Sequence, residues 1–192
     1  LLDASPFGNH GTLTNGPAWG GGPNRLALSF DGTDDFVSVA DSASLDITGP
    51  ISIPLWLNLT SYGDDNSSLV VKTSDGAMGH GAADTTYEFG FRTGLDFRIS
   101  DGVTASIVTG SKFGVSLGEW THLVAVWDGT TATNGMRIYR NGTVLYQGDS
   151  AITSIQSTTH NLVLNNPGDF AFLGLIDEVM IFNISLNASE IT

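Results

Sequence analysis

"MRIYRNGTVLYQG", residues 136–148, holds two runs of alternating apolar residues separated by Asn141-Gly142. Alternation with a period of two is typical of a β-strand that buries one face. An Asn-Gly pair between two such runs is a strong hairpin signal, because a type I′ turn requires positive φ at both central residues. The stretch therefore predicts a tight antiparallel hairpin.

The same pattern continues through the rest of the chain. The sequence contains 24 Gly, and no long segment shows the 3.6-residue period of a helix. We expect strands at 25–30, 35–40, 51–60, 68–73, 87–92, 95–100, 105–110, 120–127, 136–141, 143–148, 161–166 and 175–182. Short strands at roughly ten-residue spacing predict an all-β, antiparallel two-sheet jelly-roll sandwich of about 12–14 strands.

Two local signals qualify this pattern. Pro54 lies inside a predicted strand, and since proline cannot donate to a β-ladder, we expect an edge or bulge position there. Asn187 is followed three residues later by Glu190, which predicts a cap on a short terminal helix.

The charge balance of the chain is lopsided. Seven Lys and Arg stand against 20 Asp and Glu, for a net charge of −13, which makes nucleic acid and anionic membranes poor partners.

No run of 18 apolar residues is present, so we expect no direct membrane insertion. The length of 192 residues suits a single domain, 1–192. Because neither an initiator Met nor a signal peptide is present, we expect a piece excised from a longer extracellular protein.

Three stretches together resemble the laminin-G-like, concanavalin A-like jelly-roll family. They are 2–39 with "FDGTDDFVSV", 115–145 with "GEWTHLVAVW" and the hairpin, and 174–191 with the closing "GLIDEVMIF". The resemblance implies a fold shared by lectins, carbohydrate-binding modules, adhesion modules and some glycoside hydrolases, and the fold alone does not choose among them. In the family a further strand usually precedes the N-terminal loop, so we expect either that residues have been cut away or that a neighbouring chain, such as a second copy, fills the groove left by the missing strand.

The sequence lacks the groups that catalysis in this fold needs. The hydrolases of the family carry Glu-x-Asp-x-x-Glu, a spacing that does not occur here. Glu88, near Arg92 and Arg98 in sequence, is the one Glu on a plausible concave strand, but we expect it to be a simple exposed strand residue rather than a catalytic one. "GVSLG" (114–118) matches a nucleophile elbow but precedes a predicted strand instead of a helix. We therefore expect no enzyme activity.

Carboxylates suggest calcium, which prefers oxygen ligands. "FDGTDDF" places Asp31, Asp34 and Asp35 within five residues, and Gly32 leaves a carbonyl accessible. The resemblance implies that the closing strand runs back beside the first strands and brings Asp177 towards Asp31. We therefore predict a structural Ca²⁺ site from Asp31, Gly32, Asp34 and Asp177. In the alternative, Asp177 caps backbone N–H groups or pairs with Arg25.

A second acidic stretch and several sequons complete the candidate sites. "YGDDNSS" (62–68) offers Asp64, Asp65 and Asn66 as a rim site for a metal or ligand, or else forms an ordinary acidic turn. Asn-x-Ser/Thr occurs at Asn58, Asn66, Asn141, Asn183 and Asn187. These sequons suggest N-glycosylation of a secreted protein, with turn composition as the alternative.

These observations favour a non-catalytic extracellular or cell-surface module that recognises a glycan or an extracellular protein. One alternative is a structural subunit of a glycosylated surface filament, S-layer or adhesin. A weaker alternative is an accessory domain of a secreted glycoside hydrolase.

Overall fold

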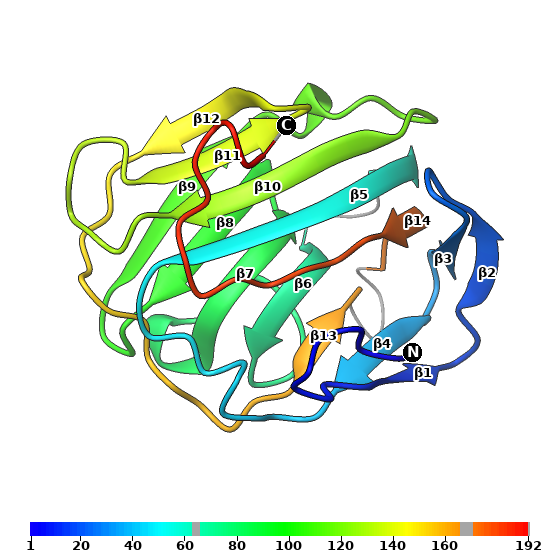
Figure 1. The fold of residues 1–192 in the computed structure, drawn as a ribbon, viewed down its shortest axis with the longest axis horizontal. Coiled ribbons are helices and arrows are strands. Elements are labelled where there is room, and N and C mark those ends of the chain that lie inside the picture. Colours follow the sequence, from blue (N-terminus) through cyan, green and yellow to red (C-terminus); the bar gives the residue numbers. More distant parts are fainter. Residues whose placement is uncertain (63–65, 166–170, 192) are drawn as a thin grey trace.

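The computed structural model describes residues 1–62, 66–165 and 171–191. Two antiparallel sheets of seven strands each lie face to face, as Figure 1 shows. This arrangement confirms the predicted all-β jelly-roll sandwich. In the described residues, neither of the two short helices has the length or the apolar character to cross a bilayer.

The first sheet, called sheet A here, has the strand order β1-β4-β13-β6-β7-β8-β9. Its strands are β1 (Gly11–Thr14), β4 (Phe36–Val39), β6 (Ser67–Thr73), β7 (Thr85–Phe91), β8 (Leu95–Ser100), β9 (Ala105–Gly110) and β13 (Leu162–Leu164). The short 3₁₀ helix η1 (Ala82–Asp84) precedes β7, and η2 (Lys112–Gly114) follows β9.

The second sheet, sheet B, has the order β12-β11-β10-β5-β14-β3-β2. Its strands are β2 (Ala18–Gly21), β3 (Leu26–Asp31), β5 (Ile51–Ser61), β10 (Thr121–Trp127), β11 (Met136–Arg140), β12 (Thr143–Gly148) and β14 (Leu173–Asp177). The closing strand β14 lies between β3 and β5, as the family resemblance implied.

Period-two alternation produces the core between the sheets. In β7, Tyr87, Phe89 and Phe91 point inward and are fully buried, while Glu88 lies on the outer face of the sheet. Trp127 at the end of β10 is fully buried as well. Burying a large apolar side chain contributes about 1.5–3 kcal/mol, so the inward rows of both sheets hold the sandwich together.

Both outer faces are covered in part. The loop after β6 brings Met78 onto Val71 and Val163 of sheet A, where a small second cluster forms. On sheet B, Leu186 and Ile191 of the C-terminal segment pack over β10 and β11. Figure 1 shows this red segment running along β5 and then across the sheet.

Every predicted range overlaps a strand, but the last one, 175–182, is too long, because β14 ends at Asp177. The predicted hairpin is present with positive φ at Asn141 and Gly142 (49° and 78°). Two strands of the N-terminal loop, β1 and β2, were not predicted. Each of them forms an edge strand of its sheet, where the sequence predicted a groove. The backbone of Leu1 exchanges two hydrogen bonds with Gly11, the first residue of β1. The predicted terminal helix is wrong, because Asn187 and Glu190 cap only a turn.

Pro54 does not lie on an edge strand, since β5 is central in sheet B. The ladder between β14 and β5 nevertheless ends at the pair of Asp177 with Trp56, which lies two residues after Pro54 in the sequence. The next residue, Glu178, has a positive φ of 50°, and the chain then returns to β5 through Met180 N–H, which donates to the Pro54 carbonyl. The missing donor of proline therefore coincides with the end of the closing strand.

Candidate binding and metal sites

The turn between β3 and β4 gathers three carboxylates. Oxygen atoms of Asp31, Asp34 and Asp35 all lie within 4.8 Å of one another, and Gly32 has a φ of 78°. Asp35 is buried and accepts a hydrogen bond from the Asp31 N–H (3.0 Å), while the other two side chains are exposed. Burial raises the pKa of Asp35, and the two neighbouring carboxylates raise it further. A cation would relieve this crowding.

Asp177 does not join this turn, which corrects the predicted four-residue calcium site. In the antiparallel register of β14 and β3, Leu173 lies opposite Asp31 and Ile176 lies opposite Leu28. Asp177 is four residues from Leu173, and at about 3.3 Å per residue this separates it from the Asp31 end by roughly 13 Å. The closing strand does run beside β3, but its antiparallel direction carries Asp177 away from the turn.

Asp177 has an unusual environment of its own. Its Oδ1 accepts a hydrogen bond from the Glu178 N–H (2.9 Å), whereas its Oδ2 is buried and has no hydrogen-bond partner among the described residues. The Oδ2 atom lies against the backbone at Gly22, where an added Cβ would come within 2.6 Å of it. Burial raises the pKa of this carboxyl. The capping alternative thus accounts for one oxygen only, and no ion pair with Arg25 occurs in the described residues.

An aromatic pair lies next to Asp177 on the outer face of sheet B. Trp56 of β5 pairs with Asp177 on one side and with His122 of β10 on the other. The two rings stack with centroids 5.1 Å apart. Burial lowers the pKa of His122, which favours its neutral form. The Trp56–His122 pair is therefore a neutral aromatic surface beside the Asp177 oxygen that has no hydrogen-bond partner in the described part of the chain.

Of the predicted rim site, Asp64 and Asp65 lie outside the described residues. Asn66 is half-buried with a φ of 85°, and its Oδ1 faces Gly79. Of the five sequons, Asn141, Asn183 and Asn187 are exposed, whereas Asn58 and Asn66 are half-buried. The three exposed positions are therefore the ones at which a glycan fits without rearrangement.

The prediction that Glu88 is a simple exposed strand residue is wrong. Its side chain is buried, and its two oxygens accept hydrogen bonds from Thr85 Oγ1 (2.8 Å) and Gly79 N–H (3.2 Å). The loop after β6 folds back over β7 and covers it, a tertiary contact that strand periodicity does not predict.

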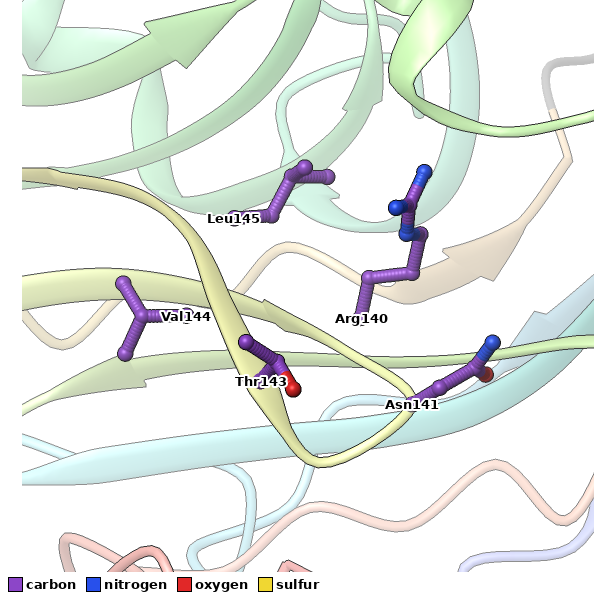
Figure 2. A pocket seen from close by; sticks show the side chains of 5 residues that line it. All are labelled: Arg140, Asn141, Thr143, Val144 and Leu145. Atoms are coloured by element: carbon purple, nitrogen blue, oxygen red, sulfur yellow. The ribbon is translucent and has the colours of Figure 1, made fainter.

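A hollow of about 240 Å³ opens beside the β11–β12 hairpin. We call it the hairpin pocket, and Figure 2 shows its lining. The lining residues are Arg140, Asn141, Thr143, Val144 and Leu145. Arg140 and Leu145 lie on the same side of the hairpin, and Arg140 donates a hydrogen bond to the carbonyl of Gly114 in η2. The pocket therefore lies where the hairpin meets the η2 loop.

An exposed aromatic ring lies in the same loop. Phe113 is 73 % exposed, next to Gly114, and its ring forms a T-shaped pair with the ring of Tyr62, with centroids 5.4 Å apart. Tyr62 in turn donates a hydrogen bond to the Val115 carbonyl (2.6 Å). Sequence reasoning missed this ring, and the available signal was a lone aromatic in the turn-rich stretch "SKFGVS". A ring held at one edge with its remaining surface in solvent is suited to stacking on a sugar or an apolar side chain.

The architecture defines an antiparallel two-sheet β-sandwich of the jelly-roll type. A laminin G family model, described as the concanavalin A-like lectin/glucanases superfamily, matches residues 31–192. The chain belongs to this superfamily. No curated protein matches the sequence.

Solved structures share the fold at low identity. The binding domain of botulinum neurotoxin serotype G superposes with a TM-score of 0.76 at 14 % identity, over 99 % of this chain and 46 % of that one. The binding domain of botulinum neurotoxin DC, solved with SialylT and with rat synaptotagmin II, gives TM-scores of 0.74 and 0.71 at 13 % identity, over 99 % of this chain and 47 % of that one. This chain thus spans about half the length of those toxin domains.

A third similar structure is closer to this chain in length. Domain 4 of an extracellular arabinanase from Geobacillus stearothermophilus, in complex with arabinotriose, gives a TM-score of 0.67 at 21 % identity. The superposition covers 96 % of this chain and 87 % of that domain. All three neighbours are similar in fold, and at these identities the likeness concerns the fold alone.

Proposed function

We propose that this chain is a non-catalytic, extracellular recognition module whose ligand is a glycan or a protein surface. The observation that carries the proposal is the hairpin pocket beside the exposed ring of Phe113. A concave site with a cationic group at its wall and an exposed aromatic ring in the adjoining η2 loop suits a sugar or a peptide side chain. The ligands named for the structural neighbours, arabinotriose, SialylT and synaptotagmin, support both ligand classes.

The carboxylates on the outer face of sheet A support a non-catalytic role. Glycoside hydrolysis requires a free acid and a free base or nucleophile facing one bond. Both oxygens of Glu88 already accept hydrogen bonds, and those of Asp96 accept from Arg92 and from Thr109. Groups held in this way are built for structure or binding.

Phe113→Ala is expected to lower ligand affinity by about 5- to 30-fold, because loss of an anchoring aromatic ring typically costs about 1–2 kcal/mol. The measurement is a glycan array followed by calorimetry on the best binder. Phe7→Ala is the matched control, since Phe7 is 69 % exposed in the N-terminal loop. Equal losses from both variants would count against the pocket, and silence on the array and in protein pull-down would count against recognition altogether.

We further propose that Ca²⁺ binds at Asp177, where the residues present fit a cation. The buried, partnerless Oδ2 lies against the backbone at Gly22, so carbonyl oxygens of the adjoining turn 22–25 are the nearest candidates to complete a ligand set. Bound there, calcium would tie the closing strand to the β2–β3 turn. Asp31, Gly32 and Asp34, together with Asp35, form a separate cluster, and their part in calcium binding stays a prediction.

Calcium is expected to raise the melting temperature of the wild type by several degrees, since a site filled at 100-fold over its Kd adds about 2.7 kcal/mol. Asp177→Asn is expected to abolish this gain, and Asp34→Asn is the matched control at the other carboxylate cluster. Thermal unfolding with CaCl₂ and with excess EDTA measures both. If Asp34→Asn alone abolishes the gain, calcium lies in the β3–β4 turn instead.

The pH dependence in EDTA gives an independent check on Asp177. Burial raises its folded-state pKa above the ordinary 3.8, so the stability that it contributes is full below pH 3.8 and is lost as the pH rises through the folded pKa. The melting temperature of Asp177→Asn minus that of the wild type is therefore expected to grow as the pH rises above 3.8. A constant difference across this range would contradict a desolvated carboxylate.

A further inference from the structure

Arg98 lies in the middle of β8 on the outer face of sheet A. Its neighbours Phe97 and Ile99 point into the core and are fully buried, so Arg98 points away from the core. An arginine on an outer sheet face is normally solvated, yet Arg98 is only 8 % exposed. Something other than the sandwich core must therefore cover it.

The segment 79–82, which precedes β7, is anchored on both sides of Arg98, and we take it as the cover. At one end, Gly79 N–H donates to Glu88, the residue directly opposite Arg98 on β7. At the other end, the Ala82 carbonyl accepts from Ser100 Oγ (2.7 Å), two residues along β8 from Arg98. Arg98 lies between these two anchor points, with Ile107 of β9 opposite it on the other side.

One edge of the guanidinium group, at Nε, is cut off from both solvent and protein acceptors among the described residues. Its Nε is buried without a hydrogen bond, and Arg98 forms no ion pair in the part of the chain that the structure describes. The neighbouring carboxylates are engaged elsewhere: Glu88 accepts from Gly79 and Thr85, and Asp96 accepts from Arg92 (3.0 Å) and Thr109. A buried Nε–H of a cation without an acceptor is costly unless a ligand supplies one.

We infer that Arg98 is the anchor of a second binding site, which takes the carboxylate of an acidic sugar. The guanidinium edge, with Nε–H and one terminal N–H side by side, matches the two oxygens of a carboxylate. The sugar identity of the ligand rests on the proposed function. Its negative charge is inferred from Arg98. Because Nε has no contact with solvent, the segment 79–82 moves aside as the ligand enters, which Gly79 and Gly81 permit.

A second arginine on the same sheet face, Arg92, can be compared with Arg98. Arg92 lies nearby on the same face, but its Nε is paired with Asp96 and its side chain is 32 % exposed. Arg92 therefore already has its anion, whereas Arg98 lacks one. The difference identifies Arg98 as the group that selects a charged ligand.

The test compares acidic and neutral sugars on the intact chain. The probes are sialyllactose, with lactose as its neutral match, and trigalacturonate, with arabinotriose as a neutral trisaccharide. We expect at least one acidic sugar to bind and its neutral counterpart to bind roughly 10- to 150-fold more weakly, because one charge-assisted hydrogen bond is worth about 1.5–3 kcal/mol. Arg98→Gln is expected to remove this preference. Which acidic sugar binds distinguishes a sialic from a uronic acid.

Two controls keep the result interpretable. Arg25→Gln removes one positive charge at an exposed position and is expected to leave the preference unchanged. The Nε–H resonance of Arg98 in the wild type reports binding directly, so the test does not depend on the folding of the Arg98 variant. It is expected to shift with the acidic sugar and to stay in place with the neutral one.

The outcomes separate this inference from the proposed function. Equal binding of acidic and neutral sugars, or an unmoved Arg98 resonance on saturation, overturns the Arg98 site and leaves glycan recognition standing. Absence of binding to every sugar overturns both.

Discussion

Lys72→Met is expected to lower the free energy of unfolding by about 3–5 kcal/mol, the cost of removing one partner from a buried ion pair. The Lys72 side chain is fully buried, and its Nζ lies 2.5 Å from Asp41 and 3.3 Å from Asp46. Nζ also donates to the carbonyls of Thr158 (2.9 Å) and His160 (2.7 Å). One ammonium group thus joins the 40–47 loop and the 149–160 loop to β6.

Methionine keeps the length and volume of the side chain, so the loss comes from the orphaned acceptors and not from a cavity. Thermal unfolding is expected to show a fall of roughly 10 °C for a chain of this size. The matched control is the triple variant with Asp41→Asn and Asp46→Asn, which removes the uncompensated charges and is expected to recover part of the loss. A shift of Lys72→Met within about 2 °C would show that the ion pair contributes little, as at exposed sites.

Gly174→Ala is expected to cost about 2–3 kcal/mol, at the upper end of the range for an overpacked site. Gly174 lies in β14 at the register shift against β5, where an ideal Cβ would lie 2.4 Å from the Asn58 carbonyl oxygen and 3.1 Å from Leu59 Cα. Both obstacles are backbone atoms, which cannot rotate away. The closing strand must therefore separate from β5 to accept a single methyl group.

Urea unfolding of Gly174→Ala measures the loss, with Gly21→Ala as the matched control. Gly21 also lies in sheet B, but an added Cβ would meet no atom within 4 Å. The control is expected to stay within about 0.5 kcal/mol of the wild type, as is usual for surface substitutions. Equal effects of both variants would show that chain entropy, and not the contact between β14 and β5, decides the result.

The sequence predicted those parts of the fold that local chemistry decides. The hairpin at Asn141 and the alternation in β7 each depend on a few adjacent residues. β1 and β2 were missed because "GTLT" and "AWGG" are short and carry little apolar alternation. They become strands by pairing with β4 and β3, which are more strongly patterned.

The candidate sites were harder to predict because they depend on register and on loops. The resemblance implied correctly that the closing strand lies beside β3, but the antiparallel register that separates Asp177 from Asp31 cannot be read from either segment. In the same way, the burial of Glu88 and Arg98 depends on a loop that folds back over sheet A. Neither the amino-acid composition nor the strand periodicity predicts such a contact between a loop and a sheet face.

The strand order has a consequence for synthesis of the chain. The β2–β3 hairpin joins sheet B only through β14, and the β1–β4 pair joins sheet A only through β13. Residues 11–39 therefore leave the ribosome with no sheet to join until residues 162–177 have followed. At typical translation rates this delay is on the order of ten seconds, during which unpaired strand edges stay open to chaperones or to neighbouring nascent chains.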